Sequence, residues 1–326
     1  MEDGYFRTVN YLRISITDKC NLRCIYCMPA EGIKLKAHEE LLRFEELTEL
    51  VKVAAELGVT KVRLTGGEPL VRKNMVSFVE AIAQVPGIDD IALTTNGVLL
   101  PKLGPALKQA GLKRVNVSLD SLQPARFRWI TRVGEWIDTW AGIETALELG
   151  FDPVKINMVV IRGVNDDEIL DFVDLTYRYP LHVRFIEFMP IGTSDGWAQK
   201  RLVPYAEIKE IIEKRVELIP VKSVKGNGPA KYYQLPGTKG TVGFISPITN
   251  HFCQHCNRLR LTAEGKLRPC LHSSWEIDLK ASLRAGASRE QLAELFREAI
   301  RRKPQHHTMS DDGWQDQPRM MYQIGG

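Results

Sequence analysis

The sequence predicts an α/β protein: an incomplete (β/α)6 TIM-like barrel followed by a C-terminal antiparallel β/α extension. Short runs rich in Val, Ile and Leu alternate with helical windows over the first 190 residues, as expected for parallel strands buried on both faces. None of these runs leads into an obvious dinucleotide-binding glycine fingerprint. After Pro190 the alternation gives way to strands separated by Gly-Pro turns. We therefore expect two parts, residues 1–190 as the partial barrel and residues 191–326 as the extension.

Six candidate strands occur in the first part, all short and apolar. They are Leu12–Ile16, Lys61–Thr65, Ile91–Thr94, Arg114–Leu119, Val154–Val160 and Val183–Phe188. The clearest helices between them are Glu45–Leu57 and Thr139–Leu149, each followed by a terminating glycine. Asn165 is the expected N-cap of a helix over Asp166–Tyr177. In barrels of this kind the chemistry collects at the carboxyl ends of the strands.

The second part is expected to contain less regular structure. A loop over Gly192–Gly196 precedes a short helix, three antiparallel strands, two further helices and a polar tail that is irregular until Met320. The helix is Pro204–Lys214, the strands are Val216–Val224, Tyr232–Leu235 and Thr241–Ser246, the later helices lie near Asp278–Ala285 and Arg289–Arg301, and the tail is Lys303–Gly326.

Bulk composition sets wide limits on function. The chain has 326 residues and a net charge of +4 without a long run of one sign, which suits an anionic small molecule as well as a nucleic acid. No stretch approaches the ~18 uninterrupted apolar residues that span a bilayer. The N-terminus lacks an apolar signal region. We expect a cytoplasmic protein, a compartment in which thiols stay reduced.

The six cysteines fall into two triplets. They are Cys20, Cys24 and Cys27, then Cys253, Cys256 and Cys270. The first triplet has the spacing Cys-x3-Cys-x2-Cys directly after the first strand. Three thiolates suit a cubane iron–sulfur cluster, which normally takes four, so one iron stays open to another ligand. A zinc site or three ordinary buried cysteines are the alternatives, and neither accounts well for this spacing.

The second triplet leaves two interpretations open. Its Cys-x2-Cys pair is typical of zinc, and His251, His255 and His272 are near enough in the sequence to complete such a site. Three thiolates again favour a cluster with an open iron. If the segment after Cys256 is a strand, Arg258 and Arg260 share one face, where guanidinium groups could hold an anion beside the cluster. A solvated strand face is the alternative for this arginine pair.

The strand Lys61–Thr65 is followed by Gly66-Gly67-Glu68-Pro69, where paired glycines allow a ligand to approach the backbone. Beside the first cysteine triplet, this motif resembles the radical S-adenosylmethionine superfamily. The resemblance implies that Cys20, Cys24 and Cys27 hold a 4Fe–4S cluster whose open iron binds the methionine moiety. It also implies that reductive cleavage of the cofactor yields a 5′-deoxyadenosyl radical.

The segment Cys256–Leu271 resembles the C-terminal signature of the GTP 3′,8-cyclase family, which catalyses the first step of molybdenum-cofactor biosynthesis. Further motifs agree with this family, and no motif position departs from it. They are Arg13–Cys20, Thr94–Gly97, Asn116–Asp120, Lys155–Asn157, Glu187–Pro190 and the terminal Gly325–Gly326. The likeness runs from about Thr8 to the C-terminus.

This resemblance implies a role for each matching residue. Tyr26, Gly67, Ser118 and Met189 would line S-adenosylmethionine. Arg13, Arg63, Thr94, Lys155, Arg258, Leu259 and Arg260 would contact GTP, with Lys61 and Arg184 as extra candidates. Cys253, Cys256 and Cys270 would hold an auxiliary 4Fe–4S cluster that meets the guanine base. The Gly325–Gly326 pair would reach the active site, a frayed end or a ubiquitin-like conjugation tail being the alternatives.

The implied reaction removes the C3′ hydrogen of GTP and joins C3′ to guanine C8. Its expected partners are a flavodoxin- or ferredoxin-like reductant and a downstream cyclic pyranopterin synthase, with no nucleic acid and no membrane. The chain would be a monomer or a homodimer. Two other classes compete: a peptide-modifying radical enzyme with an auxiliary cluster, and a metal-containing sensor that binds nucleic acid. The arginine pair disfavours the first, and the lack of a basic helix or a stacking-aromatic array disfavours the second.

Overall fold

The computed structural model describes residues 1–34, 36–189, 191, 197, 199–222, 224–226, 228–307 and 319–325. The loop expected at Gly192–Gly196 lies outside this range, as do Pro190 and Gly326. Within it, the chain forms an α/β fold with one mixed sheet, whose strand order is β12-β11-β10-β1-β2-β3-β4-β5-β6-β9-β8-β7.

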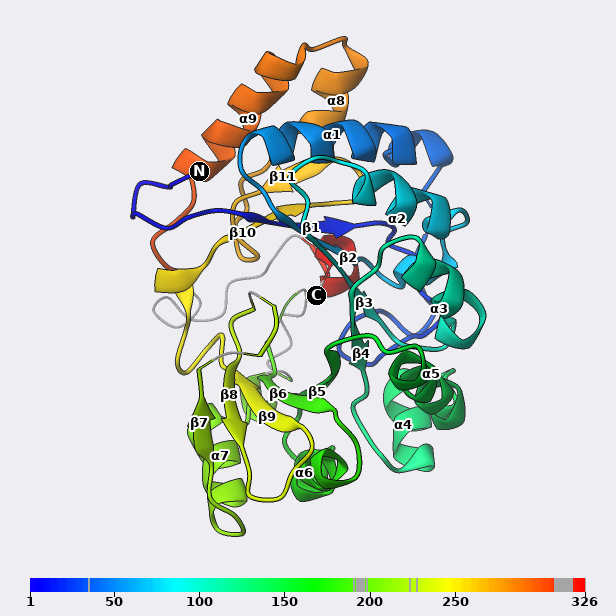
Figure 1. The fold of residues 1–326 in the computed structure, drawn as a ribbon, viewed down its shortest axis with the longest axis vertical. Helices are drawn as coiled ribbons and strands as arrows, with labels where there is room; N and C mark the ends of the chain where they lie inside the picture. The colour runs from blue at the N-terminus through cyan, green and yellow to red at the C-terminus, as the bar shows by residue number, and fades with distance from the viewer. Residues whose placement is uncertain are drawn as a thin grey trace.

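The first six strands are parallel and lie in chain order, as the alternating sequence pattern predicts. They are β1 (Tyr11–Ser15), β2 (Lys61–Thr65), β3 (Asp90–Thr95), β4 (Arg114–Ser118), β5 (Val154–Val160) and β6 (His182–Glu187). The helices that connect them are α1 (Phe44–Glu56), α2 (Met75–Ala83), α3 (Leu100–Gln109), α4 (Pro124–Thr131), α5 (Trp136–Glu148) and α6 (Ile169–Arg178). Figure 1 shows the strands in an arc with these helices on its outer side.

The C-terminal part extends this sheet at both edges instead of forming a separate one. Strand β9 (Thr241–Ile245) is parallel to β6, and β10 (Arg258–Leu261) is parallel to β1. The prediction that Thr241–Ser246 belongs to an antiparallel set is confirmed by its pairing with β8 (Lys231–Gln234), and its parallel pairing with β6 is an addition that was not predicted. The meander of β7 (Ile219–Val221), β8 and β9 is antiparallel within itself. Because the connection through α7 (Tyr205–Glu213) brings β7 back in the same direction as β6, β9 also runs parallel to β6.

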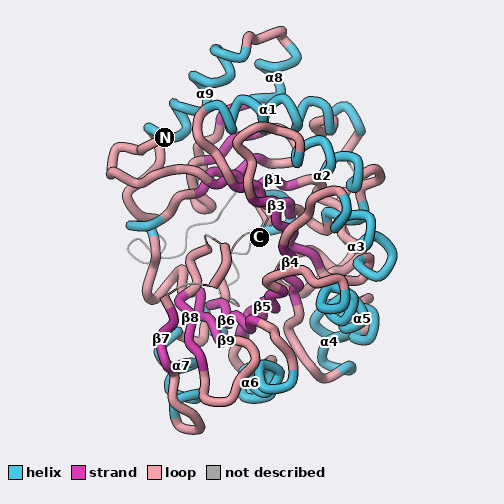
Figure 2. Tube along the Cα trace, viewed as in Figure 1, coloured by secondary structure: helices cyan, strands magenta, loops and turns pink. Residues whose placement is uncertain are grey.

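The opposite edge is completed by shorter elements. Strands β11 (Lys266–Arg268) and β12 (Ile277–Asp278) continue antiparallel from β10. Helices α8 (Leu279–Arg284) and α9 (Arg289–Arg301) then lie against α1 (Figure 2). The last element, α10 (Met321–Ile324), lies inside the arc of strands, so the chain returns from the outer surface to the interior.

Two local predictions need correction. The side chain of Asn165 does not cap a helix: it donates to the backbone carbonyls of Asp120 and Val159 and accepts from the Ile161 amide. A 3-10 turn occupies Asp166–Glu168, and α6 begins after it. The expected strand Val216–Val224 shortens to β7, an edge strand containing Pro220, which has no amide to donate to a ladder.

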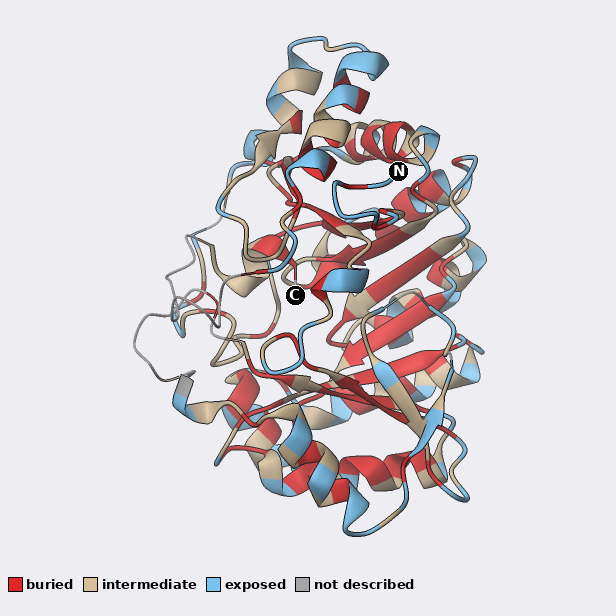
Figure 3. Cartoon of the chain, turned by 90° about the vertical axis from the view of Figure 1, so that its left-hand side faces the viewer, coloured by how far each residue is buried: buried red, intermediate tan, exposed pale blue. Residues whose placement is uncertain are grey.

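The apolar core fills the space between the sheet and the outer helices. In Figure 3 most of the strands are coloured as buried. Helix α1 buries Leu47, Leu50, Val51 and Ala54, the face that the sequence periodicity predicts. Several charged side chains are also buried on the strands: Arg63, Lys155, Arg184 and Arg260 are at most 7% exposed. Buried cations on the inner side of a sheet point to a binding site. No helix among the described residues is long and apolar enough to cross a membrane.

Candidate active site

Three arginines lie side by side across neighbouring strands. Arg13 on β1 is in register with Arg63 on β2 and with Arg260 on β10. Because directly opposite residues of adjacent strands share a face, their side chains form one cationic row. Arg63 donates to the hydroxyl of Tyr11 and, at 3.2 Å, to Thr94 Oγ1.

The row continues in polar residues on the next strands. Asn116 on β4 is in register with Thr94 on β3 and Lys155 on β5, and Ser118 is in register with Asn157. The Oδ1 atoms of Asn116 and Asn157 are buried and have no hydrogen-bond partner among the described atoms, as is also true of Arg184 Nε. Both asparagines were missed as site residues. The period of two along a strand could have found them, because each is two positions from a residue that was predicted.

Most of the predicted site residues line one cavity at the carboxyl ends of the strands. All six cysteines belong to it, together with Tyr26, Gly67, Ser118, Met189, Arg13, Arg63, Thr94, Arg258 and Arg260. Three GTP candidates lie outside the lining: Lys61, Lys155 and Leu259. Leu259 is fully buried in the apolar core, so only its backbone is available to a ligand there, and Lys61 is the first residue of β2, at the end away from the cavity. Lys155 donates from Nζ to the carbonyl of Lys225 at 2.8 Å.

The glycine motif and the first cysteine loop are held against each other by backbone hydrogen bonds. The amide of Gly67 donates to Thr17 O at 2.7 Å, and that of Glu68 donates to Lys19 O at 2.8 Å. A Cβ atom on Gly67 would lie 2.4 Å from Lys19 O, closer than any real contact. The two glycines thus allow β2 to approach the loop that carries Cys20.

Glu68 connects the glycine motif to the end of β3. Its carboxylate accepts from the Leu70 amide at 3.1 Å, from Thr95 Oγ1 at 2.8 Å and from the Asn96 amide at 2.7 Å. Burial raises the pKa of Glu68 to about 7, against the lowering effect of these hydrogen bonds. The side chain therefore joins β3 to the glycine loop at the cavity wall.

Tyr26, between the second and third cysteines, is positioned by a buried carboxylate. Its hydroxyl donates to Asp120 Oδ2 at 2.6 Å, and Asp120 Oδ1 accepts from the Val159 amide at 2.9 Å. The aromatic ring also meets Phe188 edge to face at 6.0 Å. The loop is thereby held against β4, β5 and the end of β6, so the tyrosine face is fixed at the cavity wall.

The thiols of the first triplet are neutral at physiological pH unless a metal compensates their charge. Burial raises the pKa of Cys20 to about 11 and that of Cys27 to about 12, and it raises the pKa of Cys24 as well. Iron supplies the positive charge that a buried thiolate otherwise lacks. Three such thiols on one loop, beside backbone groups that approach closely through Gly67, fit a three-cysteine cluster with one open iron.

The second triplet is in a more cationic environment. Lys303 Nζ lies 3.4 Å from Cys256 Sγ and also donates to the carbonyls of Arg258 and Pro269, each at 2.9 Å. Burial would raise the pKa of Cys256, but Arg258 and Lys303 outweigh it and lower this pKa to about 6. Arg7 donates to Cys253 O at 2.8 Å, which ties the N-terminal segment to the same loop.

Among the described residues, no three His, Cys, Asp or Glu side chains converge as ligands of a single metal ion. A cubane cluster has a different requirement, because each of its cysteines binds a different iron.

The cations of the inner face repel one another. Burial and the neighbouring Arg260 lower the pKa of Arg13, and burial together with Arg258 lowers that of Arg260 to about 10. Burial, Arg184, Arg114 and Arg63 lower the pKa of Lys155 to about 6. Such a cluster is costly when no counter-charge is present, and a polyanionic ligand would relieve the repulsion.

The C-terminal tail contacts the cation row. Arg260 Nη1 donates to the carbonyl of Gly325 at 2.6 Å. Gly325 adopts a φ of +70°, and a Cβ there would lie 2.5 Å from Thr65 Cγ2, so the chain needs glycine to pass this strand end. Met321 lines the cavity as well. The tail thus reaches the cavity through Gly325.

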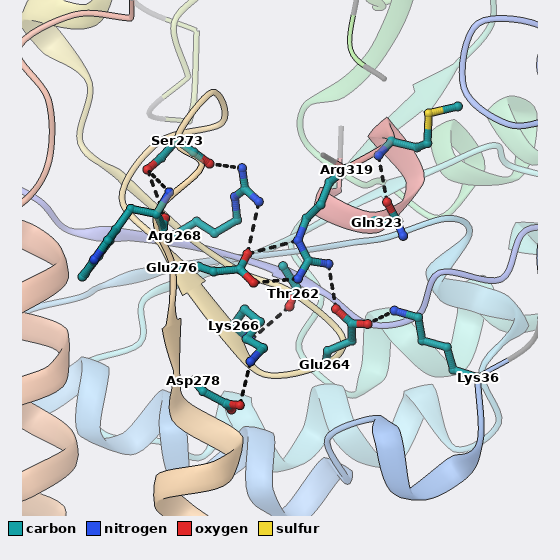
Figure 4. A network of polar contacts seen from close by, with 12 residues as sticks. Lys36, Thr262, Glu264, Lys266, Arg268, Ser273, Glu276, Asp278, Arg319 and Gln323 are labelled. Atoms are coloured by element: carbon teal, nitrogen blue, oxygen red, sulfur yellow. Dashed lines mark hydrogen bonds and ion pairs between the residues drawn. The ribbon is translucent and has the colours of Figure 1, made fainter. Parts of the chain in front are cut away.

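A network of charges anchors this tail (Figure 4). Arg319 donates to both carboxylate oxygens of Glu276, at 3.0 and 2.8 Å, and to Glu264 Oε2 at 2.7 Å. Glu264 also pairs with Lys36, in the segment that follows the first cysteine loop. One arginine therefore connects α10, the β10–β12 region and the segment after Cys27.

Comparison with known proteins agrees with this geometry. Residues 14–176 match the model of the Radical SAM superfamily, and residues 181–309 match Molybdenum Cofactor Synthesis C. A GTP 3′,8-cyclase of Heliobacterium modesticaldum is 55% identical over all of both chains. The GTP 3′,8-cyclase of Pelotomaculum thermopropionicum is 56% identical, again over 100% of each.

A solved structure shows the same fold at low sequence identity. Streptococcus suis SuiB, bound to its precursor peptide SuiA, superposes with a TM-score of 0.61 at 14% identity. The match covers 85% of this chain and 65% of SuiB. At this identity the likeness concerns the fold alone, whereas the full-length sequence identities establish the family. The chain belongs to the GTP 3′,8-cyclase family of the radical S-adenosylmethionine superfamily.

Proposed function

We propose that this protein converts GTP to (8S)-3′,8-cyclo-7,8-dihydroguanosine 5′-triphosphate, the first step of molybdenum-cofactor biosynthesis. One observation carries the proposal: a single cavity is lined by two cysteine triplets and by the arginine row of β10, β1 and β2. Such a cavity can hold a radical-generating cofactor at one end and a polyanion beside it. The cluster and S-adenosylmethionine, when bound, supply the radical chemistry that removes the C3′ hydrogen of GTP.

Cys20, Cys24 and Cys27 hold the first 4Fe–4S cluster in this proposal. Gly67 offers backbone to the methionine moiety, Tyr26 and Met189 flank the adenosyl group, and Ser118 contacts it from β4. The close backbone approach at Gly67 and the fixed Tyr26–Asp120 contact support these assignments. They leave the chain itself two tasks, orienting the cofactor and excluding water.

Arg13, Arg63, Thr94, Lys155 and the Arg258–Arg260 segment bind GTP, with Arg184 and Lys61 as further candidates. A triphosphate carries about four negative charges, and charge-assisted bonds to guanidinium groups are the strong ones. The mutual repulsion of the buried cations supports an anionic occupant. The buried unpaired carbonyl oxygens of Asn116 and Asn157 add acceptors that suit the ribose hydroxyls or the base.

Residues 1–190 form the partial (β/α)6 barrel in this proposal, and residues 191–326 form an extension that carries the second cluster on Cys253, Cys256 and Cys270. Its open iron meets the guanine base. The chain position of Gly325, bonded to Arg260, supports a role of the tail in closing the substrate site. The reductant, a flavodoxin or ferredoxin, and a cyclic pyranopterin synthase complete the set of partners, and the reduced cysteines favour a cytoplasmic location.

The proposal is tested with anaerobically reconstituted, dithionite-reduced protein, GTP and S-adenosylmethionine. We expect about eight iron atoms per chain and 5′-deoxyadenosine that forms only when GTP is present, together with the cyclised nucleotide. Protein with both clusters intact that forms no GTP-dependent 5′-deoxyadenosine would contradict the function. About four irons or fewer with stoichiometric zinc would contradict the second cluster.

Replacing Arg260 with alanine tests the cation row. Because Arg260 would lose a charged hydrogen bond to the substrate, we expect GTP affinity to fall by roughly 1–3 kcal/mol while both clusters remain. Isothermal titration with GTP measures the change. Arg301→Ala, at an exposed arginine on α9 that pairs with Glu294, is the matched control and should bind GTP as the parent does. Equal GTP affinities for the two variants would remove Arg260 from the phosphate site.

A further inference from the structure

Lys303, the second residue after α9, is a buried lysine beside the second cysteine triplet. Only 3% of its surface is exposed, and it is not among the residues that line the cavity. Its Nζ lies 3.4 Å from Cys256 Sγ and donates to the carbonyls of Arg258 and Pro269, each at 2.9 Å. An ammonium group has three N–H donors, so these acceptors use all of them. Burial of a charged amine is costly unless it is paired in this way, which points to a role for the charge.

The backbone that carries Lys303 is fixed to the same region of the molecule. On one side it continues directly from the end of α9. On the other side, Arg7 donates to the carbonyls of Pro304 and Gln305, at 2.8 and 2.9 Å. The same guanidinium group donates to Cys253 O at 2.8 Å. The helix and the N-terminal segment together therefore set the position of the ammonium group relative to the second triplet.

Two explanations fit a lysine in this place. As a structural clamp, it would only connect the strand after Cys256 to the segment before Cys270, and the two carbonyl groups would suffice for that. The third acceptor is different, because it is the sulfur of a cysteine that binds iron in the proposed function. Hydrogen bonds to such sulfurs and nearby charge set the reduction potential of an iron–sulfur cluster. Arg258 Nη2 also lies 3.6 Å from this sulfur, but Arg258 lines the cavity and is proposed to bind GTP, whereas Lys303 does not line it.

We propose that Lys303 is a positioning residue of the second cluster and that its ammonium group stabilises the reduced form of that cluster. This inference rests on the proposed function, in which the second triplet holds a 4Fe–4S cluster. One-electron reduction adds one negative charge to the cluster, and an ammonium group in contact with a ligand sulfur offsets that charge. Because the ammonium group is buried, salt screens this interaction little. The cluster should therefore have a more positive midpoint potential than it would have beside a neutral side chain.

The experiment is a potentiometric titration of the anaerobically reconstituted holoenzyme, followed by electron paramagnetic resonance. Lys303→Met removes the charge with little change in the length of the side chain. At a fixed potential near the parent midpoint, we expect the ratio of reduced to oxidised second cluster to fall by about tenfold or more. For one electron, a tenfold change is a shift of about 59 mV to more negative potential. The Cys24→Ala/Cys27→Ala variant, which removes the first cluster, identifies the signal of the second.

Lys280→Met is the matched control, since it makes the same replacement at a lysine of α8 whose Nζ donates to Glu40 O at 2.6 Å. It should leave the midpoint potentials of both clusters at the parent values. Lys303→Arg keeps the charge and should retain a midpoint close to that of the parent. Lys303→Gln keeps an N–H donor without the charge, so its midpoint should shift as in Lys303→Met. If Lys303→Met fails to fold, the comparison of the arginine and glutamine variants decides.

A parent midpoint in Lys303→Met, or equal midpoints in Lys303→Arg and Lys303→Gln, would overturn the role of the charge and leave Lys303 as a structural clamp. A parent protein with about four irons and stoichiometric zinc would remove the second cluster and this inference with it. Protein with both clusters that forms no GTP-dependent 5′-deoxyadenosine would contradict the proposed function alone, because the midpoint potentials are measured without GTP.

Discussion

Lys155 shows how burial of one side chain can couple substrate binding to a proton. Its pKa is lowered to about 6 by burial and by Arg184, Arg114 and Arg63, so the amine is neutral near pH 7.5 in the free protein. A triphosphate brought near it would restore the charged form. We therefore expect GTP binding at pH 7.5 to take up as much as about one proton, measured by titration calorimetry in buffers of different ionisation enthalpy.

The lowered pKa of Lys155 also predicts how the free energy of unfolding depends on pH. Between about pH 6 and the usual lysine pKa, the unfolded chain holds a proton that the folded chain does not, so this residue makes the free protein more stable as pH rises through that window. Lys155→Met should remove both the proton uptake and this slope. Lys113→Met, at an exposed lysine directly before β4, serves as the control that keeps both. Proton uptake that persists without Lys155 would contradict the assignment.

Gly67 is a position where one methyl group should matter. A Cβ there would lie 2.4 Å from Lys19 O and 2.6 Å from Asp18 O, so Gly67→Ala must push the cysteine loop away from β2. We expect a loss of stability of roughly 1–3 kcal/mol and weaker S-adenosylmethionine binding, followed by denaturant unfolding and equilibrium dialysis. Gly4→Ala, where nothing lies within 4 Å, should change neither, and a Gly67→Ala protein with parent affinity would show that the close approach is dispensable.

At the residue scale, the sequence predicted chemical types better than contacts. The cysteines were proposed from their spacing, whereas Tyr26, Arg13 and Arg63 were expected only from the family resemblance, and all of them line one cavity. Asn116 and Asn157 were missed, since a neutral amide in an apolar strand has an ordinary structural explanation. Leu259 and Lys155 lie outside the cavity lining, a distinction that depends on side-chain direction and on the loop carrying Lys225.

At the element scale, Arg319 links the described part of the tail to the β10–β12 region. Its guanidinium, 15% exposed, bridges Glu264 and Glu276 with three hydrogen bonds. A lysine could not reproduce that fork. Arg319→Lys and Arg319→Ala should therefore release α10, raising amide hydrogen exchange over residues 321–325 and raising the KM for GTP, with alanine the more severe.

Arg302→Ala provides the comparison, because that arginine is 57% exposed and pairs with Glu298 within its own helix. It should leave both the exchange of the tail and the KM unchanged. If Arg319→Ala leaves the exchange of residues 321–325 at the parent level, α10 is held by its apolar contacts and the network is not its anchor.

Element boundaries followed from local signals wherever those signals were strong. The helix expected at Arg289–Arg301 has those bounds, and Ser288 caps it by accepting from the Gln291 amide. The N-cap prediction for Asn165 is wrong although an asparagine before acidic residues is a good capping pattern. The side-chain amide instead donates to the carbonyls of Asp120, after β4, and of Val159 on β5. The parallel pairing of β9 was missed because strand direction depends on the crossover before it, which alternating hydrophobicity does not report.

At the scale of the whole molecule, the site is assembled by strands that are far apart in the chain but adjacent in the sheet. Arg13 and Arg260 are adjacent through β1 and β10, and the second cysteine triplet flanks that pair. The sequence predicted two triplets and two parts of the chain, but it held no signal that the later part would complete both edges of the earlier sheet. Such pairing depends on which sheet edges remain unpaired after the first six strands form. It can therefore be seen in the structure but not in the local sequence pattern.

This arrangement predicts that the two parts fold as one unit. A chain ending at residue 190 lacks β9 and β10, which leaves β6 and β1 as exposed edges and removes α9 from α1. We expect that fragment to aggregate, whereas the metal-free full chain should unfold in one transition with coincident circular dichroism and tryptophan fluorescence midpoints. A chain ending at residue 307 keeps both edge strands and should retain that single transition. A folded, soluble 1–190 fragment, or two separated transitions in the full chain, would show instead that the barrel is independent and that the extension is only docked against it.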